Sequence, residues 1–198
     1  MDQPVKQPNL AIELKGLTKT FGEVIANKDI DLTLKHGEIL ALLGENGSGK
    51  TTLMNMLSGL YRPDSGEIYV GGRLVDIRSP HDAIALGIGM IHQHFKLVDV
   101  LSVRDNIVLG TKSGGKSRAQ LTAEIVEISE RFGLSVEPDR KIYSLSVGEK
   151  QTVEILKVLY RGARILILDE PTAVLTPQET ERLFEILRKM KPVSYTHL

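Results

Sequence analysis

The sequence predicts an α/β fold with a mostly parallel core sheet, and two apolar runs that each precede a helix carry that prediction. Residues 38–43 and 165–168 are nearly continuous apolar runs, which is typical of strands buried on both faces of a sheet. Helical periodicity follows them, at 51–60 and at about 177–190. Strands that alternate with helices along a chain favour a parallel sheet covered by helices.

The start of the chain departs from this pattern and predicts an antiparallel edge. Residues 10–14 and 30–34 alternate between apolar and polar side chains on either side of Phe21 and Gly22, as expected of two paired strands. The other predicted elements are short and separated by turn residues: strands at 68–70 and 88–91, helical segments from 103 to about 133 and at 149–160, and a loop at 113–116.

Composition is that of an ordinary globular protein and excludes several classes. The 198 residues suit one domain, and 25 Lys and Arg against 25 Asp and Glu leave no net charge. This balance argues against a protein that binds nucleic acid or anionic lipid through a basic excess. The absence of cysteine excludes disulfides and thiolate zinc sites. Residues 1–8 lack the apolar region of a signal peptide, and the nearly apolar stretch 83–91 is too short to span a membrane.

A phosphate-binding motif follows the first apolar run. The residues Gly44-Glu45-Asn46-Gly47-Ser48-Gly49-Lys50-Thr51 fit G-x-x-x-x-G-K-[ST] at every fixed position. Glycines let backbone N–H groups turn inward around a phosphate, and the helix that follows points its positive end at the same anion. Lys50 then reaches the β- and γ-phosphates, and the Thr51 hydroxyl binds Mg²⁺. The alternative is a glycine-rich turn with a chance lysine, but the preceding strand and the following helix argue against it.

Two carboxylates, Asp169 and Glu170, end the second apolar run. Ligands of parallel sheets bind outside the carboxyl ends of the strands, so Asp169 would face the Mg²⁺ held by Thr51. Glu170 could then orient or deprotonate the attacking water. An acidic pair after a strand is by itself more often a helix cap. The phosphate loop earlier in the chain reverses that preference.

A third motif, Leu145-Ser146-Val147-Gly148-Glu149-Lys150-Gln151, opens the helix predicted to run to residue 160. Ser146 with Glu149 three residues later forms a capping box, which is a sufficient structural explanation. A helix N-terminus made of small residues can also bind an anion, including the γ-phosphate of a nucleotide.

Together, in this order and separation, the three motifs resemble the ATP-binding subunit of an ABC transporter, over about residues 10–191. The family signature Leu-Ser-Gly-Gly-Gln appears here with Val147 for the first Gly and Glu149 for the Gln. Two further segments resemble those of the importers of nucleosides and simple sugars. Such ATPases commonly hold two cassettes in one chain, and this chain resembles the N-terminal one. These segments are His92-Gln93-His94-Phe95 and Asp169-Glu170-Pro171-Thr172-Ala173-Val174-Leu175-Thr176.

The resemblance implies ATP and Mg²⁺ as ligands and assigns roles to individual residues. Gln93 matches the family's glutamine loop, and Phe21 stands where an aromatic stacks on adenine; the alternative for Phe21 is a core or turn aromatic. The expected catalytic residues are Glu170, Gln93 and Lys50, and the expected metal ligands are Thr51, Gln93 and Asp169. Nucleotide contacts are expected from Phe21 and from Gly44, Glu45, Asn46, Gly47, Ser48, Gly49, Lys50, Thr51 and Thr52. His92 and His94 are expected to be surface or loop-packing residues, because nothing supplies further metal ligands.

The resemblance also implies partners. Two cassettes close head to tail on two ATP molecules, so Ser146, Val147, Gly148 and Glu149 would serve the site of the opposite cassette. A helical subdomain at about 96–147 would contact a membrane permease at the cytoplasmic face of the cell membrane, with a solute-binding protein acting indirectly. No nucleic acid is expected as a partner.

Domain boundaries and two alternatives complete the sequence-based expectations. Residues 1–9 are expected to be a flexible lead-in, 10–191 a cassette incomplete at its C-terminus, and 192–198 a non-native tail. One alternative function is a truncated nucleotide-binding fragment with little or no turnover. The other is an ABC ATPase outside transport, such as a translation factor or DNA-repair enzyme. The neutral charge argues against nucleic-acid versions of this second alternative.

Overall fold

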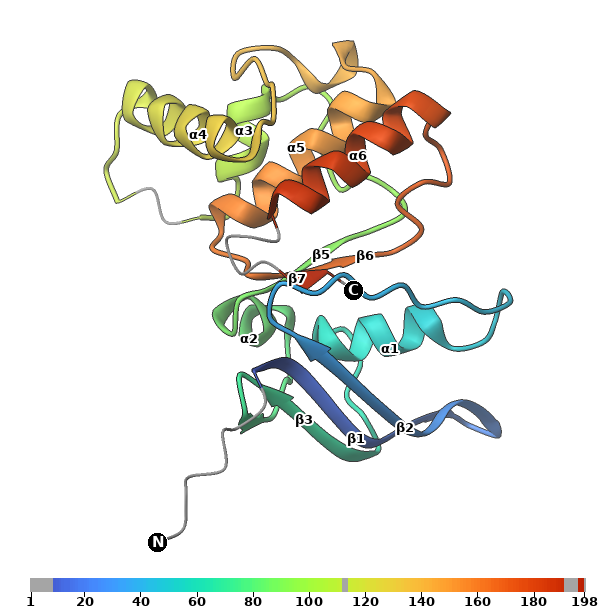
Figure 1. Cartoon of the computed structure of the whole chain (residues 1–198). Helices are drawn as coiled ribbons and strands as arrows, with labels where there is room; N and C mark the ends of the chain where they lie inside the picture. Colours follow the sequence, from blue (N-terminus) through green and yellow to red (C-terminus); the bar gives the residue numbers. More distant parts are fainter. Residues whose placement is uncertain (1–8, 112–113, 191–195, 198) are drawn as a thin grey trace, which may run out of the picture.

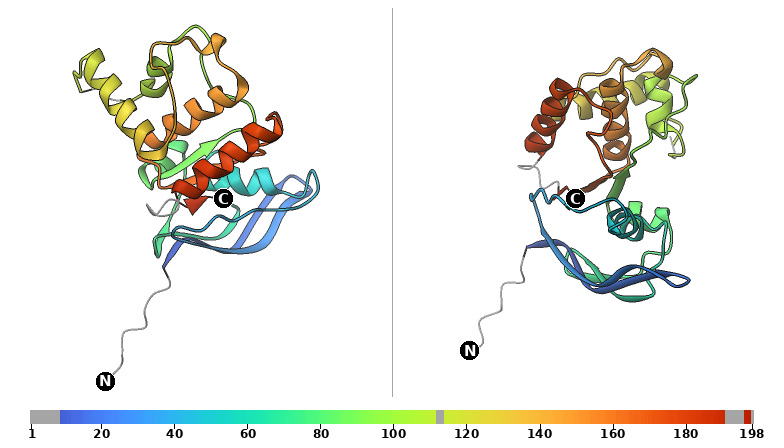
Figure 2. Two further views of the ribbon diagram at one scale, coloured as in Figure 1. Left: turned by 45° about the horizontal axis from the view of Figure 1, so that its top comes forward. Right: turned by 90° about the vertical axis from the view of Figure 1, so that its right-hand side faces the viewer.

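The computed structural model describes residues 9–111, 114–190 and 196–197. Their elements stack in four layers, visible from bottom to top in Figure 1 and from two further directions in Figure 2. An antiparallel sheet lies at the bottom, two helices separate it from a parallel sheet, and four helices cover the other face of that parallel sheet.

The antiparallel sheet has the strand order β2-β1-β3-β4. A two-residue turn at Gly22 and Glu23 joins the long strands β1 (Leu10–Phe21) and β2 (Val24–Lys35). The shorter strands β3 (Ser65–Val70) and β4 (Arg73–Val75) extend the sheet beyond β1. The predicted antiparallel strands therefore form, and they belong to a sheet of their own rather than to the edge of the parallel one.

The parallel sheet contains β5 (Ile88–Ile91), β6 (Ile165–Leu168) and β7 (Thr196–His197), with β6 in the middle. All four residues of β6 are buried, as its apolar sequence predicts. Side chains of a strand point alternately to opposite faces. Ile165 and Ile167 accordingly pack toward the antiparallel sheet, whereas Leu166 and Leu168 pack toward the outer helices.

Helices fill the remaining layers. Between the sheets lie α1 (Lys50–Leu57) and α2 (Pro80–Ala85), and over the outer face lie α3 (Val103–Val108), α4 (Arg118–Phe132), α5 (Val147–Tyr160) and α6 (Pro177–Met190), as Figure 1 shows. A short 3₁₀ turn (Ile142–Ser144) precedes α5. The predicted helix bounds at 177–190 are confirmed, and α1 ends three residues before the predicted end at 60, with Ser58 as its C-cap.

One predicted strand is wrong. Residues 38–43 do not form a strand, and the Leu43 side chain is 93 % exposed. A strand in a parallel sheet is stable only when neighbours accept and donate its backbone hydrogen bonds. Among the described residues no strand ladder runs along 38–43, so its apolar composition alone cannot make it a strand.

Several expectations fall partly outside the described residues. These include most of the lead-in at 1–9, Ser113 of the predicted loop, and all of the tail 192–198 except residues 196 and 197, which form β7 beside β6. Within the described part of the chain, no helix has both the length and the apolarity needed to cross a membrane.

Candidate active site

The phosphate loop occupies the connection that leads into α1. Gly47 and Gly49 have φ angles of 83° and 88°, which glycine adopts readily and other residues rarely do. At Gly49 a Cβ atom would lie 2.2 Å from the carbonyl oxygen of Ala26, so the loop packs directly on the β2 backbone. The Asn27 amide donates a hydrogen bond to the Gly49 carbonyl (3.3 Å).

Lys50 lies at the first position of α1 and its side chain folds back over the loop. Its Nζ donates to the carbonyl oxygens of Gly44 (2.7 Å) and Glu45 (2.8 Å) and to the Ser48 hydroxyl (3.3 Å). The ammonium therefore stands above the backbone turn in which a phosphate would be enclosed. The contact of Lys50 with the phosphates of a nucleotide stays a prediction of the motif.

The acidic strand end meets the phosphate loop in space. The Thr51 hydroxyl donates to Asp169 Oδ1 at 3.4 Å, although the two residues are 118 positions apart. The backbone N–H of Asp169 donates to the Ile91 carbonyl (3.0 Å), which continues the β5–β6 ladder to the site. A hydroxyl and a carboxylate are the oxygen donors that Mg²⁺ prefers alongside water and phosphate, so these residues fit that ion.

Gln93 and Glu170 form the second contact at this sheet edge. Gln93 Nε2 donates to Glu170 Oε2 at 2.8 Å, and both side chains are exposed. Glu170 has a φ angle of 47°, an unusual backbone conformation for a residue other than glycine. Such conformations concentrate at functional sites, where surrounding structure maintains the strain.

Phe21 ends β1 at the tip of the hairpin, on the same side of the molecule as the phosphate loop (Figure 1). The side chain is 44 % exposed, and its ring makes an edge-to-face contact with Tyr61 at 5.2 Å between centroids. Phe21 is therefore a turn aromatic outside the core, with ring surface available to solvent.

His92 is half-buried and His94 is exposed, as expected of loop-packing and surface histidines. Burial lowers the pKa of His92 from its usual 6.5. No group of three or more potential metal-binding side chains occurs in the described ranges.

Two buried charged residues of α5 hold the segment after Gln93, and sequence reasoning missed them. Glu154 Oε1 accepts the N–H of Lys96 (2.7 Å), and Lys157 Nζ donates to the Lys96 carbonyl (2.7 Å). Glu154 is 5 % and Lys157 9 % exposed. The available signal was a charged pair three residues apart in an otherwise apolar stretch of the predicted helix.

The predicted capping box at the signature is confirmed. The Ser146 hydroxyl accepts the N–H of Glu149 (3.3 Å), and Glu149 Oε2 accepts the N–H of Ser146 (2.7 Å). Arg140 Nη1 donates to the other Glu149 oxygen at 2.6 Å. These contacts lower the pKa of Glu149, first through the Ser146 N–H and then through Arg140.

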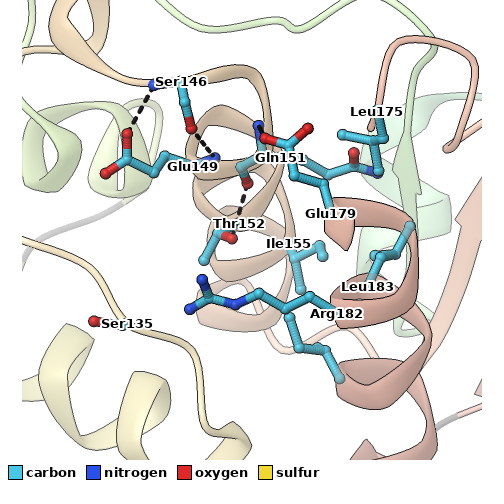
Figure 3. Close-up of a pocket in the computed structure, with 12 residues that line it drawn as sticks. Ser135, Ser146, Glu149, Gln151, Thr152, Ile155, Leu175, Glu179, Arg182 and Leu183 are labelled. Atoms are coloured by element: carbon cyan, nitrogen blue, oxygen red, sulfur yellow. Dashed lines mark hydrogen bonds between the residues drawn. The ribbon is translucent and has the colours of Figure 1, made fainter. Parts of the chain in front are cut away.

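Glu179 of α6 is a second residue that sequence reasoning missed. Its Oε1 accepts the N–H of Gly148 at 3.1 Å, and its Oε2 accepts the N–H and hydroxyl of Thr176. Gly148 and Glu179 both line a cavity of about 180 Å³ between α5 and α6 (Figure 3). Within the described residues, no hydrogen bond joins the phosphate loop to the signature.

Comparison with known proteins identifies the family. A profile described as ABC transporter matches residues 27–173. The nucleoside import ATP-binding protein NupA of Lactococcus lactis is 56 % identical over 182 residues, which cover 90 % of this chain and 36 % of NupA. The ribose import ATP-binding protein RbsA of Caldanaerobacter subterraneus is 45 % identical over 184 residues, covering 91 % of this chain and 37 % of RbsA.

A solved structure gives the same result for the fold. The structure titled "Dimeric Structure of MJ0796, a Bacterial ABC Transporter Cassette" superposes with a TM-score of 0.79 at 27 % identity, covering 94 % of this chain and 85 % of that one. The chain spans 36–37 % of the length of the two import proteins that it matches. It belongs to the ABC transporter family, as an ATP-binding cassette of this family of ATPases.

Proposed function

We propose that the chain binds ATP with Mg²⁺ and hydrolyses it to power import of a nucleoside or simple sugar through a membrane permease. The observation that carries this proposal is the meeting of the phosphate loop and the acidic strand end, through Thr51 and Asp169 at 3.4 Å. Beside it, Gln93 and Glu170 provide a polar pair at 2.8 Å. The ligand position outside the carboxyl ends of β5 and β6 is the usual one in such sheets.

The phosphate loop supplies the binding energy in this proposal. The backbone N–H groups of residues 44–52 and the Lys50 ammonium hold the phosphates, and the exposed ring of Phe21 stacks on the adenine. Thr51, Asp169 and Gln93 would hold Mg²⁺, which neutralises charge on the phosphates.

Glu170 acts as the general base. It accepts a proton from the attacking water as the water oxygen bonds to the γ-phosphorus and the bond to the β–γ bridging oxygen breaks, with ADP and phosphate as products. The amide of Gln93 donates to the Glu170 carboxylate and so orients it. The cassette otherwise contributes positioning and electrostatic stabilisation.

The signature serves a second cassette. Ser146, Val147, Gly148 and Glu149 lie apart from the phosphate loop, on the far side of the parallel sheet with α5. A head-to-tail pair would bring each signature to the opposite ATP, and the dimeric relative supports such an association. The helical region at about 96–147 would contact the permease at the cytoplasmic face of the membrane, with a solute-binding protein acting through that permease.

The relatives favour a nucleoside over a sugar as cargo. Identity is 56 % to the nucleoside import protein and 45 % to the ribose import protein, over nearly the same part of this chain. The cassette does not contact the cargo in this proposal, so the permease and the solute-binding protein select it.

A second candidate is a nucleotide-binding chain with little turnover. The absence of a strand ladder along 38–43 among the described residues favours it, because the phosphate loop then has no ladder of sheet hydrogen bonds on its N-terminal side, where Leu40 and Leu42 only pack against the core. Catalysis depends on rigid positioning more strongly than binding does.

Two variants of the purified chain test the proposal. Lys50→Ala should lose ATP binding by titration calorimetry, whereas Lys28→Ala, at an exposed lysine of β2, should retain it. Glu170→Gln should retain ATP binding and lose phosphate release by roughly a hundredfold or more. Normal phosphate release by Glu170→Gln would contradict the general-base assignment. ATP binding without phosphate release in the unaltered chain would favour the second candidate.

A further inference from the structure

The signature of this chain carries a charge that the family pattern lacks. Glu149 replaces a neutral glutamine within the first turn of α5, next to the N–H groups that the proposed function directs at the partner's γ-phosphate. The Ser146 N–H and Arg140 lower its pKa, so the carboxylate is ionised at neutral pH. An unpaired carboxylate here would repel the nucleotide.

Arg140 pairs with this carboxylate from outside the helix. Its guanidinium contacts both Glu149 oxygens, at 2.6 Å from Nη1 and 3.4 Å from Nη2, while Nη2 also donates to the Ser144 carbonyl at 2.9 Å. Forked contacts of this kind fix geometry as well as charge. In Figure 3 the Glu149 carboxylate points away from Glu179, on the opposite side of the first turn of α5.

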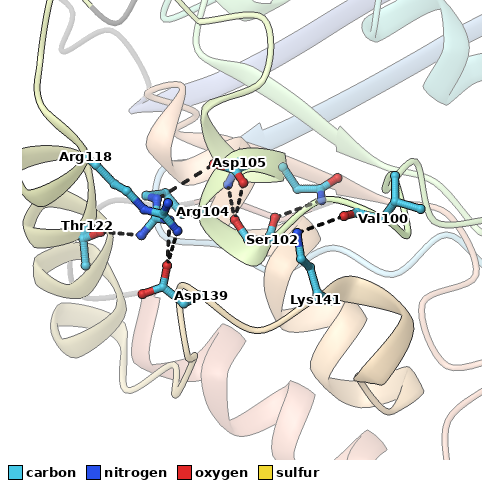
Figure 4. A network of polar contacts seen from close by, with 9 residues as sticks. Val100, Ser102, Arg104, Asp105, Arg118, Thr122, Asp139 and Lys141 are labelled. Atoms are coloured by element: carbon cyan, nitrogen blue, oxygen red, sulfur yellow. Dashed lines mark hydrogen bonds and ion pairs between the residues drawn. The ribbon is translucent and has the colours of Figure 1, made fainter.

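The segment that carries Arg140 is itself held in place, as Figure 4 shows. The neighbouring Asp139 accepts hydrogen bonds from Arg104 and Arg118, each at 2.6 Å. The Arg104 side chain is only 2 % exposed and also donates to Thr122. A buried guanidinium is costly unless its donors are paired, so this network favours one position of the Asp139 carboxylate.

Backbone bonds add a second restraint on the same segment. The N–H of Val103 donates to the Arg140 carbonyl (2.9 Å), and the N–H of Arg104 donates to the Pro138 carbonyl (2.9 Å). Residues 138–140 are therefore joined to the start of α3 on both sides of Asp139. The Arg140 side chain therefore reaches the signature from a backbone segment that these hydrogen bonds hold in place.

We propose that Arg140 is a positioning residue of the signature, which neutralises Glu149 and holds its carboxylate away from the nucleotide bound by the opposite cassette. The proposal rests on the proposed function, because it requires that the signature meets the partner's ATP. In this proposal the positive charge of Arg140 compensates the negative charge of Glu149, so the pair takes the place of the neutral glutamine of the family pattern.

A double-mutant cycle in the hydrolysis-blocked Glu170→Gln chain tests the proposal. ATP-dependent self-association is followed by light scattering, and the ATP concentration at half-maximal association is compared. Arg140→Gln should raise this concentration about tenfold when Glu149 is present. The same substitution should raise it less than about twofold when Glu149→Gln is also present. Arg140→Lys, which keeps the charge but not the fork, should recover most of the loss.

The outcomes separate this inference from the function on which it rests. Equal effects of Arg140→Gln in both backgrounds would show a purely structural role and overturn the inference, as would an Arg140→Lys chain no better than Arg140→Gln. Failure of the Glu170→Gln parent to associate at any ATP concentration, despite binding ATP, would overturn the head-to-tail function and the inference with it. Thermal unfolding of each variant without nucleotide shows whether the chain remains folded.

Discussion

The phosphate loop and the signature are held in the chain in opposite ways. The phosphate loop follows residues 38–43, which make no strand, and the Lys50 side chain is held by carbonyl and hydroxyl oxygens of the loop itself. The signature begins a 14-residue helix with a capping box, and side chains from two other segments, Arg140 and Glu179, bind its first turn.

The two motifs also differ in how the sequence encodes them. A phosphate loop is recognisable because its glycines and lysine are required by the ligand, whatever surrounds them. A helix start is encoded by neighbouring residues, since capping depends on positions three apart. The capping box secures the signature locally and Arg140 and Glu179 add contacts from other segments, whereas the phosphate loop packs on the β2 backbone at Gly49.

Among substitutions that compare the two regions, Gly49→Ala in the phosphate loop is expected to lower the free energy of unfolding the most. The new Cβ would meet the Ala26 carbonyl at 2.2 Å at a φ angle of 88°, and backbone atoms cannot move aside cheaply. We expect a loss of about 2–3 kcal/mol in the free energy of unfolding, measured in urea, together with loss of ATP binding. An unfolding free energy equal to that of the unaltered chain would show that the loop can move off β2.

Gly148→Ala is the matched substitution at the signature and should cost far less. Its Cβ would meet Glu179 Oε1 at 2.6 Å and Cδ at 3.0 Å, which are atoms of a flexible side chain and not of the backbone. Alanine also favours the helix by up to about 1 kcal/mol, so the unfolding free energy should change by less than about 1 kcal/mol. A loss as large as that of Gly49→Ala would remove the distinction between the two regions.

The smallest effect concerns Asp64, which ties the hairpin of Phe21 to the segment after α1. Its carboxylate accepts from Lys19 Nζ (2.8 Å) and from the N–H (2.7 Å) and hydroxyl (2.8 Å) of Thr20. The hydrogen bonds of Lys19 and then Thr20 lower the pKa of Asp64 from 3.8 to about 2. Because the folded-state pKa is depressed, this stabilisation is complete above 3.8 and is lost as pH falls toward 2.

Asp64→Asn should therefore reduce Tm slightly at neutral pH and make the fall of Tm in acid shallower. Thermal unfolding at several pH values from 6 down to about 2 measures both effects. Thr20→Ser keeps the hydroxyl donor and should retain the acid profile of the unaltered chain. An Asp64→Asn chain with an unchanged acid profile would contradict the assigned role of Asp64.

Most elements of the fold could be predicted because their signals are local. The alternation around Phe21, the apolar run at 165–168 and the Ser146 capping box each specify an element by neighbouring residues. The strand predicted at 38–43 failed because a parallel strand needs partners that no local pattern supplies. The antiparallel pairing of 10–14 with 30–34 was predicted, although strand periodicity does not say which sheet a strand joins.

The candidate site likewise contains residues that the sequence could predict and residues that it could not. Motif and order were enough to bring Lys50, Thr51, Asp169 and Glu170 into one hypothesis, and the structure places Thr51 beside Asp169. Arg140 and Glu179 could not be found in this way, because their contacts with the signature depend on how the 137–140 turn and α6 pack against α5. Residues that position a motif from other segments stand at no fixed sequence distance from it, so a motif pattern does not identify them.

The central claim is that the phosphate loop and the acidic strand end form one Mg²⁺–ATP site. The most direct measurement is the affinity for ATP with and without Mg²⁺, in the unaltered chain and in Asp169→Asn. Mg²⁺ should tighten ATP binding by the unaltered chain about tenfold or more and binding by Asp169→Asn less than about twofold, while metal-free affinity stays similar. An Asp169→Asn chain with the full Mg²⁺ response would contradict the claim.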